Sequence, residues 1–133
     1  AAKYLKLSDE RLKGFEPPEN VPESVMHQYT GAYLAEHEFG ITDEDVLNAI
    51  RYHTSGRAGM SPLEKLIFLS DMLEEGRVYE GVDRLRAIFA RDIDECMEEA
   101  LKEQLKYLKS SGKEIYPLTQ QAYDYIRAER AKK

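Results

Sequence analysis

Apolar residues recur along most of the chain at intervals of three and four positions, which is the period of an amphipathic helix. No segment alternates apolar and polar residues as a half-buried strand does. The pattern predicts a short turn and six helices, over 8–12, 23–39, 42–53, 61–77, 82–90, 93–109 and from 117 onward. We therefore expect an all-α fold, a single helical bundle over residues 1–133 with a solvated, frayed basic tail at 127–133.

Two of the predicted helices have recognisable start signals. Thr42 stands where an N-cap residue is expected, and an aspartate follows three positions later, as in a capping box. Ser61 is followed by Pro62 and Glu64, a stronger signal because proline suits the first helical position and glutamate completes a capping box. This spacing places His53 in the last turn of the earlier helix.

The helix that begins after Ser61 carries an acidic residue close to its apolar side. Apolar and small residues at helical spacing form its predicted buried stripe, namely Leu63, Leu66, Ile67, Ser70 and Leu73. Asp71 follows Ile67 by four positions and is therefore expected on or beside this face. Because burying an unpaired carboxylate is costly, Asp71 needs a partner. A salt bridge, a helix cap and a metal ion each meet that need.

The residues around His53 carry groups that suit a phosphate. Taken alone, His53 is explained as a histidine near a helix C-terminus, where the macrodipole favours it. Thr54, Arg57 and Arg77 add hydroxyl and guanidinium donors, which bind phosphate oxygens well. Together with Asp71, this set favours a metal-phosphate site.

Composition excludes several functional classes. The net charge of −6 argues against general nucleic-acid binding, which needs a basic surface. No apolar run approaches the roughly 20 residues of a membrane-spanning helix, and there is no signal-peptide pattern. The single cysteine, Cys96, excludes an internal disulfide, fits a reducing compartment and lies among apolar helix positions. We expect a cytoplasmic protein that does not bind a membrane.

Four motifs carry a resemblance to a known family. They are His27-x-x-x-Gly31-Ala32, Ala49-Ile50-x-x-His53-Thr54-x-Gly56, Met60-Ser61-x-Leu63-Glu64-Lys65 and Leu69-Ser70-Asp71-x-x-Glu74-x-x-Arg77. They resemble the YqeK family of bacterial HD-domain phosphohydrolases, over residues 1 to about 80, with further helices at 82–131. The resemblance implies an HD-domain bundle and an enzyme that hydrolyses diadenosine tetraphosphate symmetrically to two ADP. It also implies a di-iron centre, with manganese or another divalent metal as the alternative.

The resemblance assigns roles to individual residues. The implied metal ligands are His27, His53 and Asp71; the implied catalytic residues are Lys3, Arg57 and Arg77; and the implied substrate-binding residues are Thr54, Gly56, Arg57, Arg77 and Tyr79. The glycine-bearing loop would add backbone amides as phosphate donors. The family's early histidine ligand and its adjacent His-Asp pair have no counterpart in this sequence.

Two other functional classes stay open. One is a different HD-type nucleotide phosphohydrolase, which would release other products. The other is a non-catalytic helical module that binds nucleotides. In each case the expected partner is a dinucleoside polyphosphate or a nucleoside diphosphate, and a homodimer is left open.

Overall fold

The computed structural model describes residues 9–132, which form helices and no strand. In chain order the elements are η2 (Glu10–Leu12), α1 (Glu23–His37), α2 (Glu44–Arg51), α3 (Pro62–Leu73), α4 (Val82–Phe89), α5 (Ile93–Ser110) and α6 (Pro117–Ala131). The predicted all-α class is confirmed. Lys3 lies outside the described residues.

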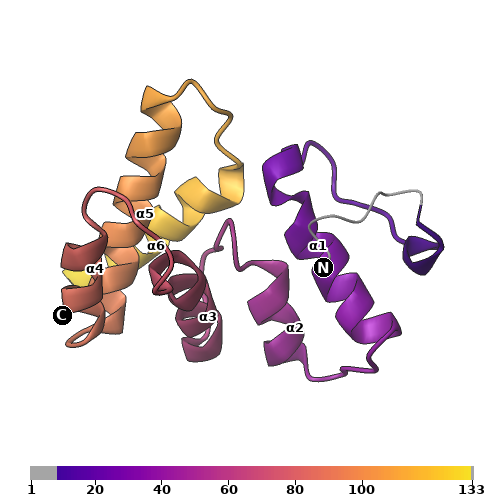
Figure 1. The fold of residues 1–133 in the computed structure, drawn as a ribbon. Helices are drawn as coiled ribbons and strands as arrows, with labels where there is room; N and C mark the ends of the chain where they lie inside the picture. The colour runs from indigo at the N-terminus through magenta and orange to yellow at the C-terminus, as the bar shows by residue number, and fades with distance from the viewer. Residues whose placement is uncertain (1–8, 133) are drawn as a thin grey trace.

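The helices form two groups with α3 between them (Figure 1). On one side α1 packs against α2, and α2 packs against α3. On the other side α5 packs against α4, α6 and α3. The segment between α2 and α3 therefore runs where the two groups meet. None of the helices within residues 9–132 is long and apolar enough to cross a bilayer.

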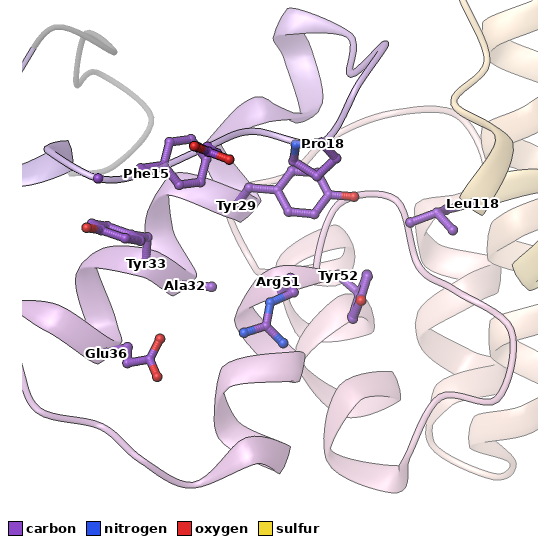
Figure 2. Close-up of a pocket in the computed structure, with 11 residues that line it drawn as sticks. Phe15, Pro18, Tyr29, Ala32, Tyr33, Glu36, Arg51, Tyr52 and Leu118 are labelled. Carbon is purple, nitrogen blue, oxygen red and sulfur yellow. The ribbon is translucent and has the colours of Figure 1, made fainter.

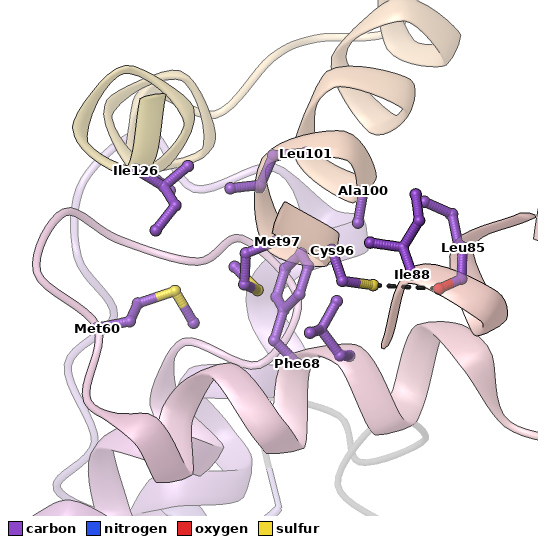
Figure 3. Packing of buried hydrophobic residues seen from close by; sticks show 11 residues of the cluster. Met60, Phe68, Leu85, Ile88, Cys96, Met97, Ala100, Leu101 and Ile126 are labelled. Carbon is purple, nitrogen blue, oxygen red and sulfur yellow. Dashed lines mark hydrogen bonds between the residues drawn. The ribbon is translucent and has the colours of Figure 1, made fainter. Parts of the chain in front are cut away.

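The main hydrophobic core lies in the group formed by α3 to α6 (Figure 3). Its buried members are Met60, Phe68, Leu69, Leu85, Ile88, Cys96, Met97, Ala100, Leu101, Ala122 and Ile126. The thiol of Cys96 is fully buried and donates to the carbonyl oxygen of Leu85 at 3.4 Å. Burial raises the pKa of this thiol to about 11. The prediction that Cys96 belongs to the core is confirmed.

One predicted helix start is confirmed and the other is wrong by one residue. Ser61 caps α3 through its side chain, and Glu64 returns a bond to the Ser61 backbone, so the capping box is complete. The N-cap of α2 is Asp43, not Thr42, and its carboxylate accepts from two backbone amides of the first turn. A carboxylate also complements the positive helix N-terminus better than a hydroxyl does.

The predicted buried stripe of α3 is partly wrong. The buried side chains are Glu64, Phe68 and Leu69, whereas Leu66 is 39% exposed and Ile67 is 38% exposed. Apolar residues occupy nearly every side of this helix, so their spacing alone does not define the buried face. The helix also ends at Leu73, earlier than the predicted end at 77.

The C-terminal segment is more ordered than predicted. Helix α6 continues to Ala131, and Ile126 is buried within it. Near its end, Arg130 Nη1 donates to Glu98 Oε1 on α5 at 3.0 Å. The predicted fraying from residue 127 onward is therefore wrong for the described part of the tail.

Candidate functional site

The loop after α2 carries the predicted site residues. Helix α2 ends at Arg51, so His53 lies two residues beyond it and not in its last turn as predicted. The chain then turns sharply, and Gly56 N donates to Tyr52 O at 2.8 Å. The turn places the side chains of His53 and Thr54 toward α1, as their contacts below show.

Gly56 is needed for both the turn and the packing. Its φ of 72° is the left-handed conformation that favours glycine. A Cβ at this position would lie 3.2 Å from the Cβ of Ala122 on α6. Its amide is already bonded within the turn, so the loop geometry explains this glycine without a phosphate.

The loop is held in place by two glutamines, Gln28 and Gln104, that no sequence motif indicates. Gln28 is fully buried, and its Oε1 accepts from Thr54 N at 3.0 Å and Ser55 N at 3.1 Å. Its Nε2 donates to Ser55 Oγ at 2.9 Å. From α5, Gln104 Nε2 donates to Thr54 O at 3.2 Å. Helices α1 and α5 therefore fix the backbone that precedes Gly56.

The structure brings the two predicted histidine ligands together. The rings of His27 and His53 have centroids 5.0 Å apart and are inclined at 72°. Thr54 Oγ1 lies 3.0 Å from His27 Nε2, which links the loop hydroxyl to the first ring. The two imidazoles and the hydroxyl thus form one cluster between α1 and the loop.

The tautomer of neutral His53 follows from its hydrogen bond. Its Nδ1 lies 2.6 Å from the carbonyl oxygen of Ile50. A carbonyl oxygen only accepts, so Nδ1 carries the proton and the lone pair is on Nε2. Histidines that bind metals commonly have this arrangement, in which one ring nitrogen donates to a carbonyl and the other binds the ion.

Arg57 lies next to this cluster in the sequence but binds a buried carboxylate. Its Nε and Nη2 donate to Glu64 Oε1 and Oε2 at 2.7 and 2.9 Å, and its guanidinium carbon lies 4.8 Å from the ring centroid of Tyr52. Burial opposes ionisation of Glu64, but the hydrogen bonds from Arg57 and from Ser61 N outweigh it and leave the pKa of Glu64 below its usual value. The hydrogen bonds to Glu64 raise the pKa of Arg57 in turn.

Asp71 and Arg77 form an exposed ion pair. Arg77 Nη2 lies 3.6 Å from Asp71 Oδ1, and each side chain is 51% exposed. This finding favours the salt-bridge interpretation of Asp71 among those that the sequence left open. The expectation that Asp71 lies on or beside the buried face is wrong, because the buried side of α3 is the one that carries Phe68 and Leu69.

Arg86, which the sequence analysis did not single out, organises the segment after α3. Its guanidinium donates to the carbonyl oxygens of Leu73, Glu74 and Arg77 at 3.2, 2.9 and 2.9 Å. Tyr79 closes the same segment by donating to Met72 O at 2.9 Å, and burial raises the pKa of its hydroxyl. The segment that carries Arg77 and Tyr79 is thus fixed to α3 and α4.

The donor set only partly fits a metal centre. Two imidazoles suit iron, manganese and similar ions. Across residues 9–132, however, no three side chains of His, Cys, Asp or Glu lie close enough together to hold an ion. The described residues therefore supply a pair of histidines and not a complete ligand set.

Comparison with known proteins defines the class. A protein from Clostridium acetobutylicum, described as a predicted HD superfamily hydrolase involved in NAD metabolism, has a similar structure with a TM-score of 0.81 and 35% identity, covering 88% of this chain and 63% of that protein. The fold is thus that of an HD superfamily hydrolase, a class that implies a divalent metal.

Sequence relatives define the family more narrowly. The chain is 39% identical to the symmetrical bis(5'-nucleosyl)-tetraphosphatase of Bacillus subtilis over 102 residues, which is 77% of this chain and 55% of the relative. It is 39% identical to the Halalkalibacterium halodurans protein of the same name over 107 residues, 80% of this chain and 57% of that protein. No family model matches the chain. The chain is similar to these relatives over most of its own length, which agrees with its resemblance to the YqeK family of HD-domain phosphohydrolases, and it spans little more than half of their length.

Proposed function

We propose that the protein hydrolyses diadenosine tetraphosphate and related dinucleoside polyphosphates symmetrically, releasing two nucleoside diphosphates. Its relatives bear the name of this activity, and its fold is that of an HD hydrolase. We propose iron as the metal, with manganese as the alternative. When bound, such an ion lowers the pKa of a water molecule and so supplies a hydroxide near neutral pH.

The observation that carries this proposal is the histidine pair. The rings of His27 and His53 lie in contact, and the bond from His53 Nδ1 to Ile50 O leaves the lone pair on Nε2. A neutral imidazole oriented in this way is prepared to bind a metal ion. We propose that both histidines are ligands, together with groups that residues 9–132 do not supply, and that Asp71 joins them after leaving Arg77.

The other predicted residues act on the substrate. We propose that the hydroxyl of Thr54 orients His27, to which it is bonded, and that Arg77 and Lys3 neutralise phosphate charge. Arg57 uses two guanidinium nitrogens to bind Glu64, so its Nη1 is the donor that we propose for the phosphate. Tyr79 would contribute a half-exposed aromatic ring near Arg77.

The test compares two histidine variants of the intact protein. We expect His53→Ala to lose bound metal and turnover of diadenosine tetraphosphate together. The matched control is His37→Ala, because His37 is exposed at the end of α1 and its ring stacks on Tyr33. Metal content and chromatography of the products are measured for each. Full turnover and full metal content in His53→Ala would overturn the assignment.

A second candidate function is a non-catalytic module that binds nucleotides. The observation that favours it is that no three potential ligands lie together within residues 9–132. The two functions differ in metal content and in turnover of the intact protein. Retention of nucleotide without metal and without product would favour the binding module.

Three properties of the whole protein belong to the same proposal. We propose that residues 1–133 form a single HD-type domain, to which α4 to α6 contribute the core described above. We propose a cytoplasmic location, because the single cysteine is buried and free, as is usual in a reducing compartment. Sedimentation of the intact protein measures whether it forms a homodimer.

A further inference from the structure

A cavity of about 440 Å³, whose lining residues are drawn in Figure 2, includes neither His27 nor His53 in its lining. It is bounded by α1, by the segment before α1, by the end of α2 and by the start of α6. Four aromatic rings line it, those of Phe15, Tyr29, Tyr33 and Tyr52. Its charged lining residues are Glu16, Glu36 and Arg51.

Within α1, the residues that line the cavity lie on a different face from His27. Tyr29, Tyr33 and Glu36 recur at helical spacing and line the cavity. Glu36 follows His27 by nine residues, which corresponds to about 180° around an α-helix. A ligand in the cavity would therefore not share the space between His27 and His53.

We propose that this cavity is a second site, which binds a nucleoside phosphate. Tyrosine and phenylalanine faces stack on nucleobases. The carboxylate of Glu36 can accept hydrogen bonds from ribose hydroxyls. Nη1 of Arg51 already donates to Asn48 Oδ1, so its other guanidinium nitrogens are the donors for a phosphate. The volume lies within the range of roughly 300–1,000 Å³ found for small-molecule sites. The choice of a nucleotide as the ligand rests on the proposed function.

Arg51 and Tyr52 connect the cavity to the loop after α2, which carries His53 and Thr54. Arg51 is the last residue of α2, and Tyr52 directly precedes His53. The guanidinium of Arg57, which does not line the cavity, lies over the ring of Tyr52 at 4.8 Å from its centroid. A base that stacks on the other face of Tyr52 would thus share this ring with Arg57. Product nucleotide bound here therefore contacts the loop without occupying the histidine site.

The experiment measures ADP binding to the intact protein in the presence of EDTA, which suppresses metal-dependent binding at the histidines. Backbone amide signals are followed by NMR during the titration. We expect ADP to shift the signals of Ala32, Arg51, Tyr52 and Leu118, all of which line the cavity. We expect Arg51→Gln to weaken binding about tenfold, the typical effect of losing a charge-assisted hydrogen bond.

The control variant is Glu38→Ala, compared with Glu36→Ala. Both glutamates are exposed near the end of α1, but only Glu36 lines the cavity. We expect weaker ADP binding for Glu36→Ala and unchanged binding for Glu38→Ala. Shifts confined to His27, His53 and Thr54, equal effects of the two glutamate variants, or no shift at all would overturn the proposal. Because ADP binding in the presence of EDTA requires no turnover, failure of the proposed hydrolysis is seen separately, as intact diadenosine tetraphosphate in the metal-loaded assay.

Discussion

The side-chain amide of Gln28 holds Ser55 from two sides. Its nitrogen donates to Ser55 Oγ at 2.9 Å, and its oxygen accepts from Ser55 N at 3.1 Å. All of these groups are buried. Because buried polar groups left without partners are costly, this pair couples the position of the loop to the packing of α1.

Replacing Gln28 should destabilise the protein. In Gln28→Leu the amides of Thr54 and Ser55 lose their acceptor, so we expect a loss of about 2–4 kcal/mol in the free energy of unfolding. Urea denaturation measures this loss. The control Gln121→Leu changes an exposed residue of α6 and should alter the free energy of unfolding by less than about 0.5 kcal/mol. Equal losses in the two variants would contradict the role of Gln28.

Thr54→Val should impair function more than folding. It removes the hydroxyl that lies 3.0 Å from His27 Nε2 and keeps the shape of the side chain. Losing a group that orients a metal ligand typically reduces metal affinity or activity by about 10–100-fold. Titration of the intact protein with iron and the rate of ADP release measure the two effects. Thr42→Val, at an exposed position before α2, serves as the control and should leave both unchanged.

The Arg57–Glu64 pair should make stability depend on pH. Because hydrogen bonds from Arg57 and Ser61 N hold the folded-state pKa of Glu64 below its ordinary value, its contribution to stability is present above that ordinary pKa and is lost as the pH falls through the folded-state pKa. We expect Glu64→Gln to cost about 2–3 kcal/mol at pH 7 and progressively less as the pH is lowered toward the folded-state pKa of Glu64. Urea denaturation of the wild-type and Glu64→Gln proteins from neutral to acidic pH tests whether the difference in their free energies of unfolding shrinks. Glu75→Gln, an exposed site, should show no such trend, and a difference that grew on acidification would refute the argument.

Gly56→Ala should be costlier than Gly40→Ala. Both glycines have a left-handed φ, of 72° and 68°, so both variants strain the backbone by about 1 kcal/mol. A Cβ at Gly56 also meets Ala122 at 3.2 Å, whereas nothing lies within 4 Å at Gly40. The difference between the two free energies of unfolding therefore isolates the close approach of the loop to α6. We expect an additional loss of about 1–3 kcal/mol for Gly56→Ala.

The thiol of Cys96 should react only when the core opens. Its pKa of about 11 and complete burial keep it protonated and inaccessible near neutral pH. We expect slow alkylation by iodoacetamide at pH 8 in the folded protein and rapid alkylation in urea. Mass spectrometry over time gives both rates. Equal rates would show that the core around α5 is not closed.

Local signals in the sequence predicted local structure well. Ser61 and Glu64 lie three positions apart, and the capping box that they form depends only on the residues of one turn. The structure brings His27 and His53 together; the family resemblance implied this nearness, which no local signal indicated, and their role as metal ligands stays a prediction. The capping residue of α2 was missed because Thr42 and Asp43 are adjacent and both are good N-caps.

Contacts between distant segments could not be predicted in this way. In the sequence, Gln28 and Gln104 have the pattern of ordinary polar helix residues. Only the folded chain brings them to Thr54 in the loop after α2. The buried face of α3 was misplaced because apolar residues surround the helix, and packing against both α2 and α5 selects Phe68 and Leu69. Asp71 was consequently expected nearer to the core than its 51% exposure allows.

The three bonds from Arg86 have a consequence for the segment that follows α3. They tie the carbonyl groups of Leu73, Glu74 and Arg77 to a single side chain on α4. The backbone at Arg77 is therefore tied to α4. A displacement of this backbone toward the histidine pair requires either a shift of α4 or the release of this guanidinium, so Arg86 restrains the path of the chain after α3.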